Sequence, residues 1–274
     1  MSKVWFVTGS SRGLGRAVVE AALDAGDSVA ATARRPEQLA DLVERHGDRV
    51  LPLALDVTDF EGAQRAVAAG LERFGRIDVV VNNAGYADVA AVEDISVDRY
   101  RAQFETNFFG VVWVTKAVLP VLRQQRRGHV IQVSSLGGRI ASAGLSAYQS
   151  AKWAVGGFST GLAQEVAPFG VQVTVLEPGG IRTDWAGSSM TVPPVSDPYR
   201  QTVGRFAEFL REHHGQEPSD PRKIAALILS LAGREDAPLR LLVGPDAVEY
   251  AAGAAEALAE SDRKWRDVSV STAG

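Results

Sequence analysis

The sequence predicts an α/β fold in which one parallel β-sheet is covered by helices on both faces. Short apolar, β-branched runs alternate along the chain with longer segments of helical periodicity. The short runs are almost continuously apolar, as strands buried on both faces are. A chain of 274 residues can bury a large core, and no linker, internal repeat or low-complexity tract divides it. We therefore expect residues 1–274 to form a single domain.

The expected strands and helices follow one another in regular order. The strands are Val4–Val7, Ser28–Thr32, Val50–Leu55, Ile77–Val81, His129–Val133, Val171–Leu176 and Leu239–Val243. The helices are Leu14–Ala25, Pro36–Arg45, Asp59–Phe74, Val97–Gln125, Tyr148–Ala167 and Pro221–Leu231. Pro36 suits the first turn of a helix, and Gly26 and Gly47 stand where helices commonly end. This alternation is typical of βαβ units with right-handed crossovers.

Two stretches interrupt the alternation. Residues 181–220 form a long connection with one short helical pattern near Tyr199–Arg211, and we expect a substrate-binding loop or lid there. Its large apolar residues either line a pocket beneath a lid or form the core under a docked helix; they are Trp185, Met190, Tyr199, Phe206 and Phe209. Residues 246–274 are rich in alanine and then charged, which predicts a C-terminal helical tail with a frayed end.

Charge and cysteine content exclude several kinds of partner. A net charge of −4 provides no basic field for nucleic acid or anionic lipid. The absence of cysteine excludes disulfides and thiolate metal sites and is compatible with a reducing cytosol. We find no apolar run long enough for a membrane span or a signal peptide, so we expect a cytoplasmic protein. His213 and His214 lack a carboxylate at helical spacing, and we expect no metal site.

A glycine-rich turn, Thr8-Gly9-Ser10-Ser11-Arg12-Gly13-Leu14-Gly15, joins the first expected strand to the first expected helix. Glycines let the backbone turn tightly and approach a phosphate, and a helix N-terminus offers unpaired N–H groups and a positive dipole end. In doubly wound folds this turn holds the pyrophosphate of a dinucleotide. A glycine-rich turn without a ligand is the alternative.

Two arginines follow the second expected strand. An NAD site would place an acidic residue there for the ribose hydroxyls, whereas this chain has Arg34 and Arg35. A guanidinium matches the oxygens of a phosphate, so we expect NADP(H) to be preferred over NAD(H), with Arg12 as a further cation. Solvated loop charges are the alternative. Asp56 and Val57 follow the third strand, where adenine could be contacted, although Asp56 could equally cap the next turn.

Four motifs occur in a fixed order: TGSSRGLG, Asn82-Asn83-Ala84-Gly85, Tyr148-x-x-x-Lys152 and Pro178-Gly179. Together they resemble the short-chain dehydrogenase/reductase family in its single-domain form, over about residues 3–244. The resemblance implies a Rossmann-type, doubly wound sheet of seven parallel strands. It also implies an NAD(P)-dependent enzyme, a ketone or aldehyde reductase, that transfers a hydride between the nicotinamide and a carbonyl or secondary alcohol.

The resemblance further implies a catalytic set of Asn107, Ser135, Tyr148 and Lys152, in which Asn107 fixes a water that links Lys152 to solvent. Taken alone, these residues have ordinary explanations. A Tyr–Lys pair at i,i+4 shares one helix face and is usually a partly exposed pair. A serine at a strand end is usually a turn or a cap, and a helical asparagine could face solvent.

The expected cofactor contacts come partly from the carboxyl ends of the strands, the edge at which open parallel sheets bind ligands. The others come from the resemblance, which implies that Asn83 supports the cofactor side of the site and that Ile181 and Thr183 contact the nicotinamide amide. In chain order all the expected contacts are Gly9, Ser11, Arg12, Gly13, Leu14, Gly15, Arg34, Arg35, Asp56, Val57, Asn83, Ala84, Gly85, Tyr148, Lys152, Pro178, Gly179, Ile181 and Thr183.

The chemistry of carbonyl reduction explains a tyrosine beside a lysine. The developing oxyanion needs a proton, and an unperturbed tyrosine, with a pKa of about 10, exchanges protons poorly near neutrality. A cation within several ångströms lowers a phenol pKa by about 1–3. We therefore expect Lys152 to lower the pKa of Tyr148, and Ser135 to hydrogen-bond the substrate oxygen.

Other functions stay open on the sequence alone. A non-catalytic NADP(H)-binding protein with a redox-sensing or regulatory function is the main alternative, although it would not need the proton chemistry. A sugar-nucleotide epimerase or dehydratase would have a different glycine spacing. We expect a small, apolar carbonyl or alcohol substrate. We also expect a homodimer or homotetramer, because Val97–Gln125 and Tyr148–Ala167 have broad apolar faces that pair across a dimer axis in the family.

Overall fold

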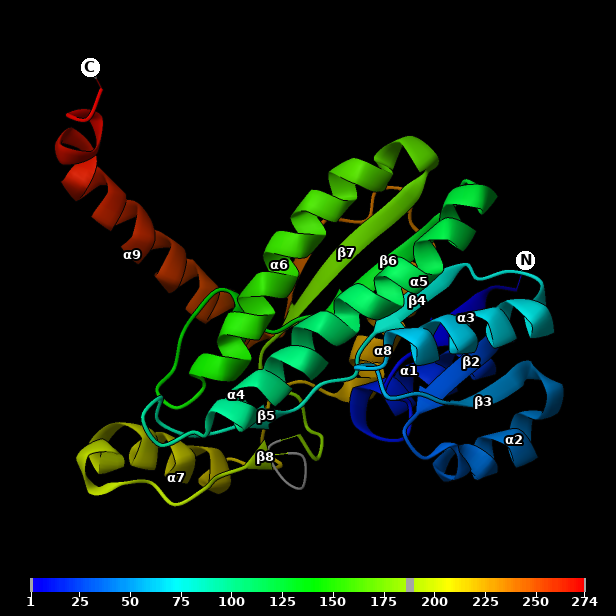
Figure 1. The fold of residues 1–274 in the computed structure, drawn as a ribbon, viewed down its shortest axis with the longest axis horizontal. Coiled ribbons are helices and arrows are strands. Elements are labelled where there is room, and N and C mark those ends of the chain that lie inside the picture. The colour runs from blue at the N-terminus through cyan, green and yellow to red at the C-terminus, as the bar shows by residue number, and fades with distance from the viewer. Residues whose placement is uncertain (1, 186–189, 274) are drawn as a thin grey trace.

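Seven parallel strands form the central sheet, in the order β3-β2-β1-β4-β6-β7-β9 (Figure 1). They are β1 (Val4–Val7), β2 (Ser28–Ala33), β3 (Val50–Ala54), β4 (Val79–Asn82), β6 (Gly128–Val133), β7 (Val171–Pro178) and β9 (Arg240–Val243). The computed structural model describes residues 2–185 and 190–273. Each strand lies within two residues of its predicted run, so the predicted Rossmann-type, doubly wound sheet is confirmed.

The strand order reverses beside the first strand. The chain runs outward from β1 through β2 to β3, and then returns to place β4 on the other side of β1. From β4 it continues through β6 and β7 to β9 at the opposite edge. In open parallel sheets, the crevice at such a reversal, beyond the carboxyl ends of the strands, is where ligands bind.

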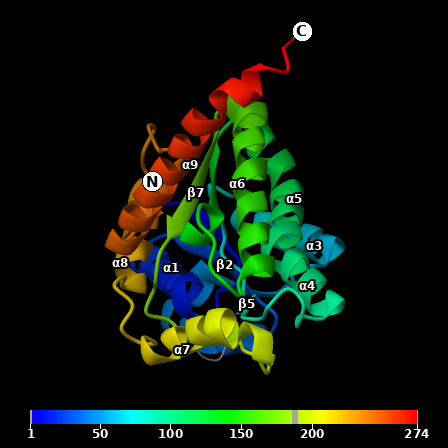
Figure 2. The same ribbon diagram turned by 90° about the vertical axis from the view of Figure 1, so that its left-hand side faces the viewer.

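Two helical layers cover the sheet, as Figure 2 shows from the side. One core packs α1 (Gly13–Asp24), α2 (Ala40–His46) and α8 (Pro221–Leu231) against one face. A second core packs α3 (Phe60–Phe74), α5 (Gly110–Gln125) and α6 (Ser146–Val166) against the other. The alternation of a strand divides its side chains between the two cores: Trp5 and Val7 of β1 enter the first, and Phe6 enters the second.

The helix predicted at Val97–Gln125 is interrupted. It consists of α4 (Val97–Phe104), a π-helical segment at Glu105–Phe109, and α5. Asn107 lies in the π-helical segment and is fully buried, and its side-chain amide donates to the carbonyl of Gln103 one turn earlier. Single-turn π segments of this kind are common at functional sites. The prediction of one continuous helix was therefore wrong at this point.

The long connection after β7 builds a small layer over the carboxyl edge of the sheet. Its two-residue strand β8 (Met190–Thr191) pairs in parallel with β5 (Ala87–Asp88), which follows β4. The helical pattern predicted near Tyr199–Arg211 is a 3-10 turn at Asp197–Tyr199, a π-helical segment at Arg200–Gly204, and α7 (Arg205–Glu212). Residues 186–189 of the predicted lid lie outside the described residues.

The predicted C-terminal tail is the helix α9 (Pro245–Val270), which leaves the body of the molecule along most of its length (Figure 1). Only Ala247 and Ala251 of this helix are buried, whereas Leu258 and Trp265 are 63% and 55% exposed. Among the described residues, no helix combines the length and the apolar character needed to cross a membrane.

Candidate active site

A cavity of about 810 Å³ opens at the carboxyl edge of the sheet, at the reversal of strand order. Its walls come from the turns after β1, β4, β6 and β7, from the start of α6, and from α7 and α9. Most of the residues predicted to bind a cofactor line it: Gly9, Ser11, Arg12, Gly13, Leu14, Arg34, Asp56, Val57, Asn83, Ala84, Gly85, Tyr148, Lys152, Pro178, Gly179, Ile181 and Thr183.

The glycine turn forms one end of this cavity. Gly9 and Gly13 have φ angles of 67° and 57°, which side chains rarely adopt. The side-chain amide of Asn83 donates to the carbonyls of Thr8 and Gly9 at 3.0 and 3.3 Å, so the turn after β4 fixes the turn after β1. Helix α1 begins at Gly13 without a side-chain cap, so its first N–H groups stay available for an anion.

Gly15 does not line the cavity, unlike the glycines before it. A Cβ there would collide with the carbonyl of Gly9 and the amide of Asn83. Its function in the turn is therefore close packing of the helix against the strand ends, which is the third-glycine function in dinucleotide-binding turns.

The two arginines after β2 are placed differently. Both are exposed, but Arg34 lines the cavity, whereas Arg35 is the N-cap of the turn that begins at Pro36 and is absent from the described lining. We expected both arginines to contact the cofactor. Only Arg34 lies in the described cavity wall, where such a contact is possible.

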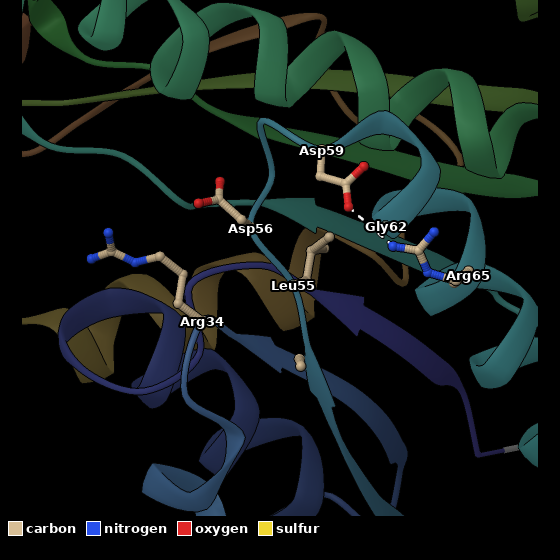
Figure 3. A pocket seen from close by; sticks show the side chains of 7 residues that line it. Arg34, Leu55, Asp56, Asp59, Gly62 and Arg65 are labelled. Carbon is tan, nitrogen blue, oxygen red and sulfur yellow. Dashed lines mark hydrogen bonds and ion pairs between the residues drawn. The ribbon is translucent and has the colours of Figure 1, made fainter.

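A second hollow of about 320 Å³ adjoins the main cavity at Arg34, Leu55 and Asp56 (Figure 3). Asp59 and Arg65 on its far wall pair with each other at 3.1 Å. The Oδ1 atom of Asp56 accepts hydrogen bonds from the backbone N–H and the hydroxyl of Thr58, so Asp56 does stabilise the next turn while it lines the cavity.

The four candidate catalytic residues meet on the opposite wall. Tyr148 and Lys152 are 6% and 3% exposed, so they do not form the exposed pair that spacing alone allows. Ser135 hydrogen-bonds to the phenol of Tyr148, and its Oγ also accepts from the N–H of Gly137 at 3.0 Å. Lys152 Nζ donates to the carbonyl of Val133 at 2.9 Å and lies 5.7 Å from the centre of the Tyr148 ring.

Asn107 is held on both sides of its amide. Its Nδ2 donates to the carbonyls of Tyr86 and Gln103, each at 2.9 Å, and its Oδ1 accepts from the N–H of Tyr86 at 3.2 Å. A Cβ on Gly85 would lie 2.7 Å from Asn107 Oδ1 and 3.6 Å from Lys152 Nζ, so these three residues adjoin. Asn107 therefore lies beside Lys152 rather than in solvent.

Burial shifts the pKa values of both Tyr148 and Lys152. It raises the pKa of Tyr148 to about 12, against which the hydrogen bond from Ser135 acts in the lowering direction. Burial also lowers the pKa of Lys152 to about 8. The expectation that Lys152 brings the pKa of Tyr148 below its ordinary value was wrong for this arrangement, because loss of hydration outweighs any attraction from the lysine.

A buried ion cluster fixes the loop that follows Ser135. Glu177, at the end of β7, is fully buried, and its carboxylate pairs with Arg139 at 2.6 Å. Arg240 of β9 donates to the same carboxylate through Nε at 2.9 Å. A charge so buried is stable only when it is paired, so the cluster ties the loop after β6 to β7 and β9.

The distal half of the cavity has a largely apolar wall, beside which His213, Gln216 and Glu217 also lie. Trp185, Phe206, Phe209 and Leu210 line it, and the Trp185 ring lies 5.3 Å from that of Tyr148. Met190 and Tyr199 pack in the hydrophobic cluster behind this wall. The two alternatives, a pocket and a core, therefore each hold for some of these residues. Trp185, Phe206 and Phe209 line a pocket, and Met190 and Tyr199 belong to a core.

Several residues that line the cavity were not predicted from the sequence. Gln149 adjoins Tyr148, and Ile140 and Leu145 come from the loop before α6. Asp246 and Tyr250 come from α9, far along the chain. The only local signal for Asp246 was its place after Gly244-Pro245, a typical helix start beyond the last strand.

Comparison with known proteins gives a consistent picture. The family model described as short chain dehydrogenase matches residues 3–191. "Oxidoreductase BOA17" of Botryotinia fuckeliana is 67% identical over 274 residues, which is 100% of both chains. A short-chain dehydrogenase from Streptomyces avermitilis has a TM-score of 0.94 and 41% identity and covers 100% of both chains.

A further solved structure carries a cofactor. A short chain dehydrogenase from Burkholderia cenocepacia, in complex with NADP, has a TM-score of 0.75 and 28% identity and covers 96% of this chain and 97% of its own. The family match includes the glycine turn, the Asn83 turn and the Tyr148–Lys152 helix, and it ends before α7, α8 and α9.

Proposed function

The chain belongs to the short-chain dehydrogenase family and is an oxidoreductase of that type, and from this premise we propose that it transfers a hydride between NADP(H) and a carbonyl or secondary alcohol. The observation that carries the proposal is the placement of Tyr148, Ser135 and Lys152 together on one buried wall of a cavity whose other end is the glycine turn. The residues that would transfer the proton and those that would bind the dinucleotide therefore line the same cavity.

The residues of the cavity fit a nicotinamide dinucleotide. The Gly9–Gly13 turn and the uncapped start of α1 suit the pyrophosphate, Asp56 and Val57 suit the adenosine end, and Ile181 and Thr183 suit the nicotinamide end. When bound, the cofactor supplies or accepts the hydride. The NADP preference rests on Arg34, which lines the cavity directly after β2 where no carboxylate follows the strand. The NADP complex of the Burkholderia cenocepacia relative supports it further.

Tyr148 acts as the general acid in reduction and as the general base in oxidation. With a pKa of about 12, its phenol is protonated at neutral pH and can donate to the substrate oxygen as negative charge develops there. Ser135 hydrogen-bonds to the same phenol and so holds it at the reaction centre. Lys152, with a pKa of about 8, is mostly cationic at neutral pH and stabilises the phenolate that reduction leaves behind. Asn107, beside Lys152, holds the route for proton return to solvent.

We assign an apolar substrate of some bulk to the distal half of the cavity. Trp185, Phe206, Phe209 and Leu210 offer aromatic and aliphatic surface there, and the Trp185 ring contacts the Tyr148 ring. Such a wall favours an apolar ketone over a small polar one, because burying apolar surface is the main source of affinity it can provide.

The outer faces of α5 and α6 suit self-association. Trp153 of α6 is 53% exposed, and open space lies over Gly157 and Gly161 of the same helix. We propose that these faces pair in a homodimer or homotetramer.

Replacement of Tyr148 by phenylalanine tests the proposed reaction. Because this change removes the proton donor and keeps the ring, we expect kcat to fall roughly a hundred- to ten-thousandfold. NADPH binding, measured by calorimetry, should stay close to that of the parent protein. Loss of cofactor binding together with activity would show that Tyr148 is structural. Failure of the parent protein to reduce any of a broad panel of apolar ketones, with NADPH still bound, would favour the regulatory alternative.

The cofactor preference is tested at Arg34, with Arg35 as a matched control. Arg34→Ala should weaken NADPH binding roughly ten- to a hundredfold, because charge-assisted hydrogen bonds to the 2′-phosphate are lost, and should leave NADH binding unchanged. Arg35→Ala removes the same charge outside the cavity and should change neither. Equal weakening of both cofactors by Arg34→Ala would refute a 2′-phosphate contact.

A further inference from the structure

Asp246 contacts the turn that follows β7 from a distant part of the chain. It lies in the first turn of α9, and its Oδ2 accepts a hydrogen bond from the N–H of Gly180 at 2.7 Å. A Cβ on Gly179 would collide with this carboxylate, so the side chain packs directly on the backbone of the turn. Asp246 also lines the main cavity.

The other hydrogen bonds of the turn join backbone groups, and Asp246 supplies the one side-chain hydrogen bond to Gly179 or Gly180 among the described residues. Gly179 donates to the carbonyl of Val243 at 3.0 Å, and the carbonyl of Gly180 accepts from Ser219 at 3.1 Å. The N–H of Gly180 has Asp246 as its acceptor. Ile181 and Thr183, at the proposed nicotinamide end, follow immediately in the chain.

Helix capping does not explain an acid at this position. The N-cap of α9 is Gly244, and the helix start has no side-chain cap. The second carboxylate oxygen, Oδ1, is buried and has no hydrogen-bond partner among the described residues. A buried acceptor without a partner costs free energy, so the fold gains from Oδ2, which binds Gly180, and from the place of the charge in the first turn of the helix, but not from Oδ1.

We propose that Asp246 is a positioning residue for the nicotinamide end of the site. Its carboxylate orients the Gly179–Gly180 turn, and through it the Ile181–Thr183 backbone, for the nicotinamide half of the dinucleotide. This inference rests on the proposed function. It assigns a function in the site to α9, which lies beyond the segment matched by the family model.

The test separates the two halves of the cofactor. Adenosine 2′,5′-bisphosphate carries only the adenosine end, whereas NADPH carries both, and calorimetry measures the affinity of each. Asp246→Ala should weaken NADPH binding about tenfold, since one charge-assisted hydrogen bond to the turn is lost, and should leave the bisphosphate affinity unchanged. Asp246→Asn keeps an acceptor oxygen for Gly180 and should restore most of the NADPH affinity. Glu249→Ala, on an exposed position of the same helix, is the matched control and should change neither.

Each other outcome overturns the inference. Equal weakening of both ligands by Asp246→Ala, or a fall in melting temperature that Asp246→Asn does not reverse, would show a structural function. Unchanged NADPH binding in Asp246→Ala would show that the turn needs no side-chain support. If the parent protein binds neither ligand, the proposed function itself fails. If the parent protein binds both ligands but Asp246→Ala does not weaken NADPH binding selectively, this inference is wrong and the proposed function is unaffected.

Discussion

A lysine and a tyrosine one helical turn apart could be picked out from their spacing, but their ionisation could not. The spacing of four predicts a shared helix face and says nothing about hydration. The structure buries both side chains under segments remote in sequence, among them the end of β6 and Trp185. Burial then raises the pKa of the phenol and lowers that of the ammonium. Loss of hydration is therefore the main cause of the pKa shifts of both side chains.

The low pKa of Lys152 has a consequence for stability. Its pKa is about 8 in the folded protein and has an ordinary value of 10.5. Between these two pKa values the unfolded chain binds more protons than the folded one, so Lys152 makes the unfolding free energy rise with pH. Below pH 8 the lysine is charged in both states, and its destabilising contribution stays constant. Lys152→Met lacks this contribution. Between pH 8 and pH 10.5 the unfolding free energy of the parent protein should therefore increase by roughly 3 kcal/mol relative to that of the variant.

Urea unfolding of both proteins at several pH values between 8 and 10.5 measures this difference. The raised pKa of Tyr148 acts in the opposite direction at higher pH and is common to both proteins, so it drops out of the comparison. Parallel stability profiles for the two proteins would contradict a buried, weakly basic Lys152.

At the level of elements, hydrophobic periodicity predicted the strands and the helices that pack on the sheet. It did not predict the irregular segments that form the walls of the site. The strands and the helices α1, α3 and α8 were predicted to within two residues because each has one apolar pattern facing one core. The π-helical segment around Asn107 could not be predicted, since it depends on bonds from Asn107 to Tyr86, which lies after a different strand. Likewise, nothing local separates Arg34, which enters the cavity, from Arg35, which does not.

The helix α9 contributes to the body of the protein through its first two turns only. Ala247 and Ala251 are buried and Asp246 and Tyr250 line the cavity, whereas the later residues are largely exposed. We expect truncation after Ala255 to lower the unfolding free energy by less than about 1 kcal/mol, because surface positions without packing contribute little. Thermal melts and NADPH calorimetry check this.

Truncation after Gly244 provides the comparison. It removes the two buried alanines and Asp246, and it should cost several degrees of melting temperature and weaken NADPH binding. A large loss of stability already in the shorter truncation would show that the projecting part of α9 is packed against something in solution.

For the whole molecule, the sequence was sufficient for the sheet, its reversal of order and the edge that holds the site. Six predicted site segments follow different strands, and a parallel sheet brings its strand ends together, so their meeting was predictable. The distal wall was not predictable, because α7 and α9 are placed by contacts with the rest of the fold and not by a pattern of their own.

The distribution of the cavity walls along the chain also has a consequence for synthesis. The residues that we propose for the adenosine end lie within the first 57, whereas Asp246 and Tyr250 are the lining residues translated last. At ordinary elongation rates, the interval between the two is roughly ten to forty seconds. A polypeptide that ends before residue 246 thus has Asn107, Ser135, Tyr148 and Lys152 but lacks the part of the cavity wall that α9 contributes.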